Sequence, residues 1–170
     1  MIGKNAEASE NLKLVIQSDP TRWKALNAAG LIFAADGKFA ESSQYFDAAA
    51  RASNFNPSVL NNQGLIKALV GNYTDATQIL ENASLRAVTS PEQKKGIDLN
   101  LALVYGISGN MDKAEKLARL YLTEPEVFNN LGVYSSFSKN KDLAKTYLNK
   151  ALADVPVYYE KAWQNLEKIQ

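Results

Sequence analysis

The sequence contains no cysteine and no histidine. The first absence excludes disulfides, thiol redox chemistry and thiolate-bound metals. The second excludes imidazole metal ligands and every catalytic triad that uses histidine as its base. We therefore expect neither a metal site nor a cofactor in this chain. The two absences do not decide between cytosol and periplasm, because a cysteine-free protein suits both compartments.

The chain also lacks a strong charge of either sign and any long apolar run. Its 19 basic and 18 acidic side chains give a net charge of +1. Nucleic-acid binding requires a concentrated basic face, so we expect no nucleic-acid partner. No apolar run approaches the roughly 20 residues of a membrane-spanning helix, and the polar start MIGKNAEASE does not resemble a signal peptide.

Acidic pairs and glycines are present, but they do not form the pattern of a catalytic site. Gly30, Gly37 and Lys38 lack the spacing of a phosphate-binding loop. Glu41 and Asp47 lie on a predicted helix without a partner base that would support general acid–base catalysis. We therefore predict that the chain is not an enzyme. An enzymatic activity would require a catalytic domain outside this chain.

Small residues recur along the chain at a regular spacing. The step from Gly30 to Gly64 equals the step from Gly37 to Gly71, and Gly132 follows Gly64 at twice that step. The copy between them is marked by Ala102, which lies four positions later than one full step after Gly64. The step from Ala102 to Gly132 is shorter by the same amount, so the two deviations cancel. They indicate a longer connection before the third copy and a shorter second helix within it.

Each copy consists of two amphipathic helices joined by a tight turn. In the second copy, apolar residues recur with helical periodicity on both sides of Gly71-Asn72. Gly64 marks the point where the two helices are expected to cross, with Leu80 and Tyr73 filling the space around it. A similar sequence opens the first helix of every copy: Leu26-Ala29-Gly30, Leu60-Gln63-Gly64, Asp98-Leu101-Ala102 and Phe128-Leu131-Gly132.

This period of about 34 residues and this pattern resemble the tetratricopeptide repeat family over nearly the whole chain. The resemblance implies an all-α fold, namely a right-handed superhelix of antiparallel helix pairs, in one domain over residues 1–170. A half-repeat is expected at the N-terminus and a capping helix at the C-terminus. The expected parts are a half-repeat over 3–20, repeats over about 23–56, 57–90, 91–124 and 125–156, and a capping helix over 157–169.

The first helix is expected to lack its partner, because Gly3 lies one full period before the turn glycine Gly37. Either the half-repeat is a natural cap, or Met1 was added where a longer protein was cut; we favour the second. An incomplete repeat could pair with another copy, so we expect a monomer or a weak dimer. The expected helices cover about 5–18, 22–36, 38–53, 57–70, 72–87, 91–108, 111–122, 125–138, 140–153 and 157–169.

The resemblance also implies a concave groove lined by the first helix of each repeat. Counting from the small residue of each first helix, the groove-facing positions form an apolar ladder with asparagines along one edge. The predicted groove residues are Asn27, Leu31, Ala35, Asn61, Leu65, Leu69, Leu99, Leu103, Ile107, Asn129, Val133 and Phe137. Apart from Lys24 near the rim, this face carries no lysine or arginine. A clamp on a peptide's C-terminal carboxylate needs such cations, so we do not expect one here.

Two interpretations of the ladder compete. In the first, its leucines pack under neighbouring helices and no groove remains. In the second, which we favour, they stay partly open and receive an apolar partner segment, whose backbone the asparagines would hydrogen-bond. The partner would then be a protein or a peptide that supplies a helix with anchors at helical spacing.

A narrower resemblance concerns the third repeat and the start of the fourth. Residues 100–106, Gly109, residues 114–119 and Asn129-Asn130-Leu131 are similar to TadD-type proteins of tight-adherence (Flp) pilus assembly. These are tetratricopeptide lipoproteins of the outer membrane. The resemblance implies a pilotin or assembly factor in the periplasm that binds a pilus secretin subunit. Membrane attachment would require a lipid anchor, which this chain lacks. The alternative is a cytoplasmic scaffold or co-chaperone with an unrelated client.

Overall fold

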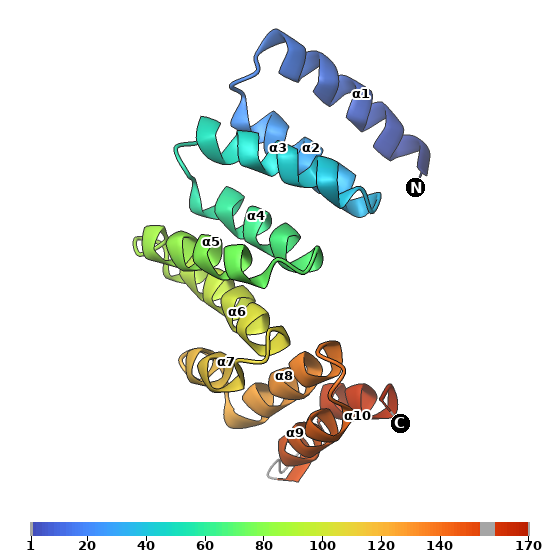
Figure 1. The fold of residues 1–170 in the computed structure, drawn as a ribbon, viewed down its shortest axis with the longest axis vertical. Helices are drawn as coiled ribbons and strands as arrows, with labels where there is room; N and C mark the ends of the chain where they lie inside the picture. The colour runs from blue at the N-terminus through green and yellow to red at the C-terminus, as the bar shows by residue number, and fades with distance from the viewer. Residues whose placement is uncertain (1, 154–158, 170) are drawn as a thin grey trace. The chain divides into compact units, whose positions relative to one another are not determined.

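The computed structural model describes residues 2–153 and 159–169, and within these ranges the chain forms ten helices and no strand (Figure 1). The predicted all-α fold is therefore confirmed. The helices are α1 (Ile2–Ser18), α2 (Trp23–Ala35), α3 (Phe39–Ala52), α4 (Pro57–Leu69), α5 (Tyr73–Arg86), α6 (Pro91–Ile107), α7 (Met111–Ala118), α8 (Glu124–Phe137), α9 (Lys141–Ala153) and α10 (Glu160–Glu167).

The chain comprises two compact units, Met1–Ile97 and Asp98–Gln170, which we call unit 1 and unit 2. Unit 1 contains α1 to α5 and the first two turns of α6. Unit 2 contains the rest of α6 and helices α7 to α10. The boundary lies inside the third predicted repeat. That the whole chain forms a single domain remains a prediction.

Several helices start where the sequence predicts a start. Pro57 and Pro91 are the first residues of α4 and α6, where the missing N–H of proline costs nothing. The side-chain oxygen of Asn56 accepts a hydrogen bond of 3.0 Å from the Ser58 N–H and so caps α4. At α8, the Thr123 N–H donates to Glu126 Oε2 over 2.8 Å, which is one half of a capping box.

The helix pairs of unit 1 cross at glycines, as the repeat pattern predicts. A β-carbon added at Gly64 of α4 would lie 2.6 Å from Leu80 Cγ of α5, so only glycine permits this approach. Gly30 of α2 meets the ring of Phe46 of α3 in the same way, at 2.9 Å. The prediction for Tyr73 is wrong: it lies at the first position of α5 with its ring partly exposed, too far from the helix centre to fill the crossing.

Unit 2 has two hydrophobic clusters. The first joins α6, α7 and α8 and consists of Ala102, Ala114, Ala118, Val127, Leu131 and Tyr134. The second joins α9 to α10 and the residues after it, and consists of Ala144, Leu148, Ala151, Ala162 and Ile169. Because α10 packs on both α8 and α9, it covers the last repeat as the predicted capping helix does.

Three helix boundaries differ from the prediction. Helix α1 begins at Ile2, so Gly3 lies inside the helix and not in a turn before it. Helix α7 ends at Ala118 and not near residue 122, because the chain turns at 119–121 to reach the cap of α8. Helix α10 begins at Glu160, and residues 154–158, including the predicted start of the capping helix, lie outside the described residues.

Candidate functional site

The exposed stripe of α2 consists of Lys24, Leu31 and Ala35. These residues are separated by seven and four positions, which places them on one face of an α-helix. All three are exposed, and Leu31 keeps 48% of its surface accessible. Asn27 lies beside the stripe and is half-buried. The face that α2 leaves uncovered therefore begins with a cation and continues with apolar side chains.

The exposed stripe of α4 occupies the equivalent positions of the next repeat, Ser58, Leu65 and Leu69. Leu69 is 64% exposed and Leu65 is half-buried. A hydrogen bond joins the two helices beside their stripes: Asn62 Nδ2 of α4 donates to Asn27 Oδ1 of α2 over 3.1 Å. The six stripe residues together with Asn27 and Asn61 form what we call the inner face of unit 1.

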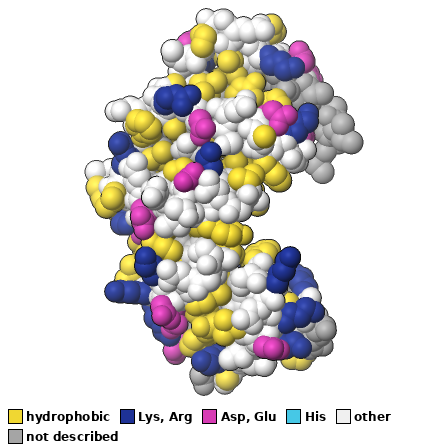
Figure 2. Space-filling view, in the orientation of Figure 1, with side chains coloured by type: hydrophobic (Ala, Val, Ile, Leu, Met, Phe, Trp, Pro, Cys, Tyr) yellow, Lys and Arg dark blue, Asp and Glu magenta, His cyan; other side chains and the backbone are white. Residues whose placement is uncertain are grey.

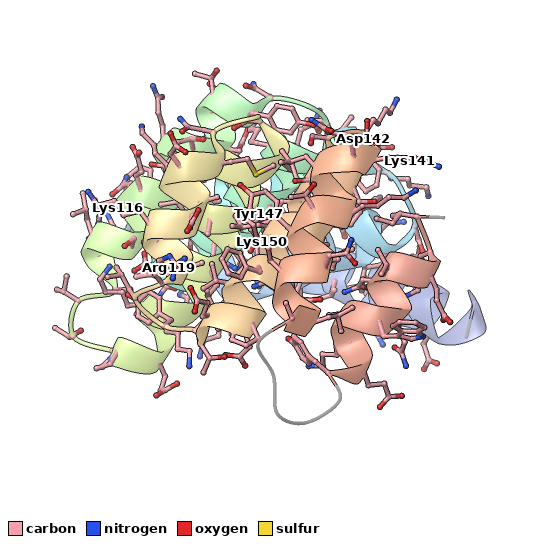
Figure 3. All side chains as sticks on the ribbon, turned by 90° about the horizontal axis from the view of Figure 1, so that it is seen from below. Lys116, Arg119, Lys141, Asp142, Tyr147 and Lys150 are labelled. Atoms are coloured by element: carbon pink, nitrogen blue, oxygen red, sulfur yellow. The ribbon has the colours of Figure 1, made fainter. Side chains whose placement is uncertain are left out.

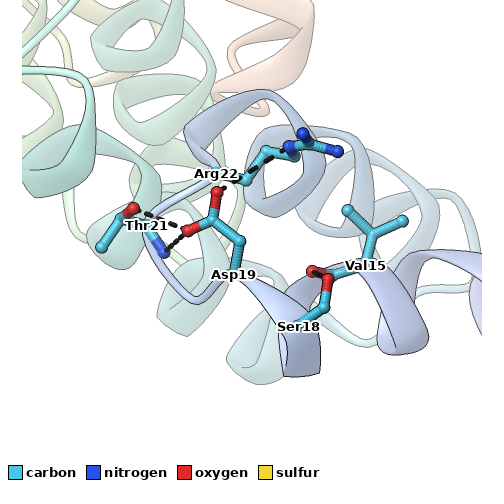
Figure 4. A network of polar contacts seen from close by, with 5 residues as sticks. All are labelled: Val15, Ser18, Asp19, Thr21 and Arg22. Carbon is cyan, nitrogen blue, oxygen red and sulfur yellow. Dashed lines mark hydrogen bonds and ion pairs between the residues drawn. The ribbon is translucent and has the colours of Figure 1, made fainter.

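Polar side chains form hydrogen bonds at the N-terminal ends of these helices. Gln93 Nε2 of α6 donates to Ser58 Oγ of α4 over 2.7 Å. Before α2, Asp19 Oδ1 accepts hydrogen bonds from the Thr21 N–H at 3.0 Å and the Thr21 hydroxyl at 2.7 Å (Figure 4). These bonds, with a smaller effect of Arg22, lower the pKa of the Asp19 carboxyl, so it is charged at neutral pH.

In unit 2, the predicted groove residues are distributed differently. Leu103 and Ile107 of α6 are half-buried and pack against the first hydrophobic cluster, so they contribute to the core. Leu99 and Val133 are also half-buried. Phe137, at the last position of α8, is 68% exposed. Phe137 is thus the predicted groove residue of unit 2 that remains open.

The expectation that Asn129 lies on an open edge requires correction. Asn129 is only 6% exposed, and its side-chain oxygen accepts a hydrogen bond of 2.9 Å from Asn165 Nδ2 of α10. This arrangement matches the bond between Asn62 and Asn27 in unit 1. In both units the asparagine oxygen already accepts a hydrogen bond from the next helix of the stack, and in Asn129 burial also keeps it from the backbone of a partner.

A cluster of aromatic and basic side chains lies where α7, α8 and α9 meet, and the sequence reasoning did not find it. Arg119, Tyr147 and Lys150 of this cluster are labelled in Figure 3. The rings of Phe128 and Tyr147 stack at 6.2 Å, and both Arg119 and Lys150 lie 5.5 Å from the centre of the Phe128 ring. Arg119 is also paired with Glu115 over 2.7 Å. Burial, with a smaller effect of nearby carboxylates, raises the pKa of the Tyr147 hydroxyl.

Unit 1 has an open hollow of about 280 Å³ between α2 and α3, large enough for one side chain of a partner. The stacked rings of Phe33 and Tyr45, 5.0 Å apart, belong to its wall. The complete lining is Leu26, Phe33, Glu41, Gln44, Tyr45 and Ala48. On the face of the molecule shown in Figure 2, apolar patches alternate with basic and acidic side chains, so charge of neither sign dominates it.

The described part of the chain contains no group of three or more acidic, histidine or cysteine side chains that could hold a metal ion. Of the helices in residues 2–153 and 159–169, none combines the length and the apolar character needed to cross a membrane.

Many solved structures resemble this chain, and three of them illustrate the likeness, which extends over nearly its whole length. YrrB, described as a tetratricopeptide protein with an unusual peptide-binding site, is 18% identical with a TM-score of 0.68, covering 98% of this chain and 85% of YrrB. PilF of Pseudomonas aeruginosa is 19% identical with a TM-score of 0.67, covering 98% and 82%. PilW, a type IV pilus biogenesis factor, is 17% identical with a TM-score of 0.69, covering 99% and 79%.

A sequence comparison agrees with the structural one. Residues 125–153, which include most of α8 and all of α9, match the family model described as tetratricopeptide repeat. The chain has the tetratricopeptide repeat fold. Among curated proteins, none matches this sequence significantly. Tetratricopeptide repeats form solenoids whose first helices present a binding surface, which is the position of the inner face of unit 1.

Proposed function

We propose that this chain is a non-enzymatic interaction module that binds an apolar or amphipathic segment of a partner protein on the inner face of unit 1. One observation carries the proposal: Leu31 and Leu69, on adjacent first helices, are 48% and 64% exposed. Burying such side chains stabilises a complex by roughly 25 cal/mol per Å² of apolar surface. Small residues beside them, such as Ala35, leave room for a helix to approach.

The exposure of these leucines also argues against the interpretation in which the ladder only fills the core. The core of the same helices is formed by other side chains, among them Leu26, Leu60 and Ile66, which are almost fully buried. Leu31 and Leu69 are therefore not needed to close unit 1. Exposed apolar side chains on adjacent helices are candidates for a binding surface.

The finer function that we propose is assembly of a pilus. PilF and PilW share this fold, PilW is a type IV pilus biogenesis factor, and YrrB has a peptide-binding site. The sequence resemblance to TadD-type proteins favours a tight-adherence pilus, with a secretin subunit as the partner. We propose a periplasmic location at the outer membrane, with any lipid anchor supplied outside this chain. A cytoplasmic scaffold with an unrelated client is the alternative.

The binding surface is tested with peptides tiled along the tight-adherence secretin subunit of the source organism. We expect at least one peptide to bind the wild-type chain, and Leu31→Glu or Leu69→Glu to weaken it about tenfold or more, since each loses a buried apolar anchor. Leu85→Glu is the matched control, because Leu85 is 73% exposed on α5 and lies outside the inner face. Circular dichroism should show the same helical content in all variants.

Two results would contradict the proposal. If Leu31→Glu and Leu69→Glu unfold the chain while Leu85→Glu does not, the leucines belong to the core. If secretin peptides bind none of the proteins, the pilus role fails. Recovery of the native full-length protein in the soluble cytoplasmic fraction would favour the scaffold.

A further inference from the structure

Charge is distributed unevenly over the inner face of unit 1. Helices α2 and α4 contain no aspartate and no glutamate, and their cations are Lys24 and Lys67. Lys67 is half-buried and lies outside the exposed stripe of α4. Lys24 is exposed in the first turn of α2, and its ammonium lies 5.6 Å from the centre of the Trp23 ring. The inner face therefore carries one open cation and no carboxylate.

Nothing in the described structure neutralises Lys24. Among the described residues, no carboxylate lies within ion-pairing distance of its ammonium. The nearest acid in the sequence, Asp19, is held by Thr21, and its closest approach to Arg22 is 3.9 Å (Figure 4). Arg22 is exposed as well, so two cations lie next to each other at the start of α2, whereas the start of α6 carries the acid Glu92.

The backbone strengthens this asymmetry. Helices α2 and α4 both pack against α3 and run parallel to each other, so both start at the edge that carries Lys24. The starts of helices carry partial positive charge, and their ends carry partial negative charge. At the other edge lie the apolar residues Leu31 and Leu69, followed by Asp36 at the C-cap of α2. The face is thus positive where the helices start and apolar where they end.

We propose that the segment bound on the inner face of unit 1 is an acidic amphipathic one, with a carboxylate over Lys24 and apolar anchors over Leu31 and Leu69. This inference rests on the proposed function and names the chemistry of the partner. Lys24 and Leu31 are seven residues apart, or roughly 10 Å along the helix. The partner therefore places its acidic side chain about two helical turns from its first apolar anchor.

Charge complementarity also fixes the orientation of the segment. With the carboxylate over the helix starts, the partner is attracted by Lys24, Arg22 and the aligned backbone N–H groups. In the reversed orientation its acid would meet Asp36 and the carbonyl ends of the helices. A basic segment would place like charge against Lys24, and the one carboxylate described above on this edge, that of Asp19, is already bonded to Thr21. The face therefore selects acidic partners and one direction.

The test is a selection from a random dodecapeptide library displayed on phage, with the full chain as bait. Enriched peptides are synthesised with a fluorescent label, and their affinity is measured by polarisation for the wild type and the variants Leu31→Glu, Lys24→Glu and Lys141→Glu. Lys141 is the matched control, because it is also an exposed lysine in the first turn of a helix, but in unit 2 (Figure 3). Glutamate at either position suits the helix start equally.

We expect enriched peptides that lose affinity with Leu31→Glu to carry aspartate or glutamate on one flank. Lys24→Glu should weaken them about tenfold at low salt and less at high salt, since the contact is exposed. Lys141→Glu should change their affinity less than twofold.

The outcomes separate the two proposals. Peptides that depend on Leu31 but carry neutral or basic flanks, or that tolerate Lys24→Glu, overturn the inference about charge and leave the apolar site standing. If no enriched peptide depends on Leu31, or none is enriched, the inner face does not bind peptides and the proposed function fails with it.

Discussion

Asn62 donates its side-chain N–H to the side-chain oxygen of Asn27 over 3.1 Å, and the two residues lie one repeat apart on the first helices α4 and α2. In unit 2, Asn165 and Asn129 repeat the arrangement at 2.9 Å on α10 and α8. Asn62 lies one position past the equivalent of Asn27, and a bond between such neighbouring helices fixes how far one helix is displaced along the next. The asparagines therefore set the register of the inner face, and the leucines beside them keep a fixed spacing.

Asn62→Ala is expected to lower the free energy of unfolding by about 1 kcal/mol, because it removes a half-buried hydrogen bond and leaves the Asn27 oxygen unpaired. Urea denaturation followed by circular dichroism measures the change. Alanine also favours the helix, so Asn11→Ala on the exposed surface of α1 is the matched control and should be neutral or stabilising. If both variants gain stability equally, the bond between Asn62 and Asn27 contributes nothing.

The sequence was sufficient to predict the number of helices in the described residues and the place where most pairs cross. A regular period with glycine or alanine at one fixed position inside a helix leaves few alternatives, since a small residue is needed there only where two helices approach closely. Gly64 meets Leu80 there, as expected, and Gly132 meets Leu148 in the same way. The shorter second helix of the third repeat was predicted as well, from the shortened step between Ala102 and Gly132.

The hydrogen-bond partners of the polar side chains could not be predicted in the same way. An asparagine at the edge of a helix can hydrogen-bond either a neighbouring helix of the same chain or a bound protein. Asn129 would occupy the same position in the repeat in both cases, so the sequence does not distinguish them. Asp98 occupies a position that is apolar in the other three repeats, yet it is 2% exposed and accepts a hydrogen bond from the Tyr121 hydroxyl. That pairing depends on how the chain turns after α7, which no local pattern specifies.

Gly64→Ala is expected to destabilise the chain by about 1–3 kcal/mol, because the new methyl group would lie 2.6 Å from Leu80 Cγ and force α4 and α5 apart. Gly96→Ala in α6 is the matched control. A β-carbon at Gly96 meets nothing within 4 Å, so alanine should stabilise that helix by up to about 1 kcal/mol. Thermal unfolding compares the two variants, and a loss of stability in both would show that helix crossing is not what Gly64 provides.

Tyr121→Phe is expected to lower stability by roughly 1.5 kcal/mol below pH 10, because the Tyr121 hydroxyl donates a 2.5 Å hydrogen bond to the buried Asp98 carboxylate. This bond, aided by burial, raises the pKa of Tyr121 from 10.0 to about 12. A raised pKa means that the contribution is complete below pH 10 and is lost as the pH rises through about 12.

The pH dependence provides the control for this variant. The wild type should lose stability between pH 10 and about 12 more steeply than Tyr121→Phe. A smaller decline should persist in the variant, because burial also raises the pKa of Tyr134 to about 12. Melting temperatures measured across this range test the prediction, and parallel profiles for the two proteins would mean that Tyr121 titrates as it does in the unfolded chain.

Lys139→Gly is expected to stabilise the chain by about 0.5–1 kcal/mol. Lys139 follows α8 with φ 62°, a left-handed conformation in which a β-carbon is strained. The three earlier repeats have glycine at this position, Gly37, Gly71 and Gly109, with φ between 73° and 90°. Glycine at position 139 keeps the two backbone hydrogen bonds that end α8. In these, the N–H of residue 139 donates to the Ser136 carbonyl and the N–H of Asn140 donates to the Ser135 carbonyl.

The reverse exchange tests the same cause in unit 1. Gly71→Lys should destabilise the chain by about 1 kcal/mol, since a β-carbon there has open space around it but an unfavourable φ of 82°. Lys145→Gly, inside α9, should also destabilise by about 1 kcal/mol, because glycine lacks helix propensity where φ is ordinary. Whether a lysine–glycine exchange stabilises or destabilises the chain should thus depend on φ at that residue. A destabilising Lys139→Gly would show that contacts of the lysine side chain offset the strain at this turn.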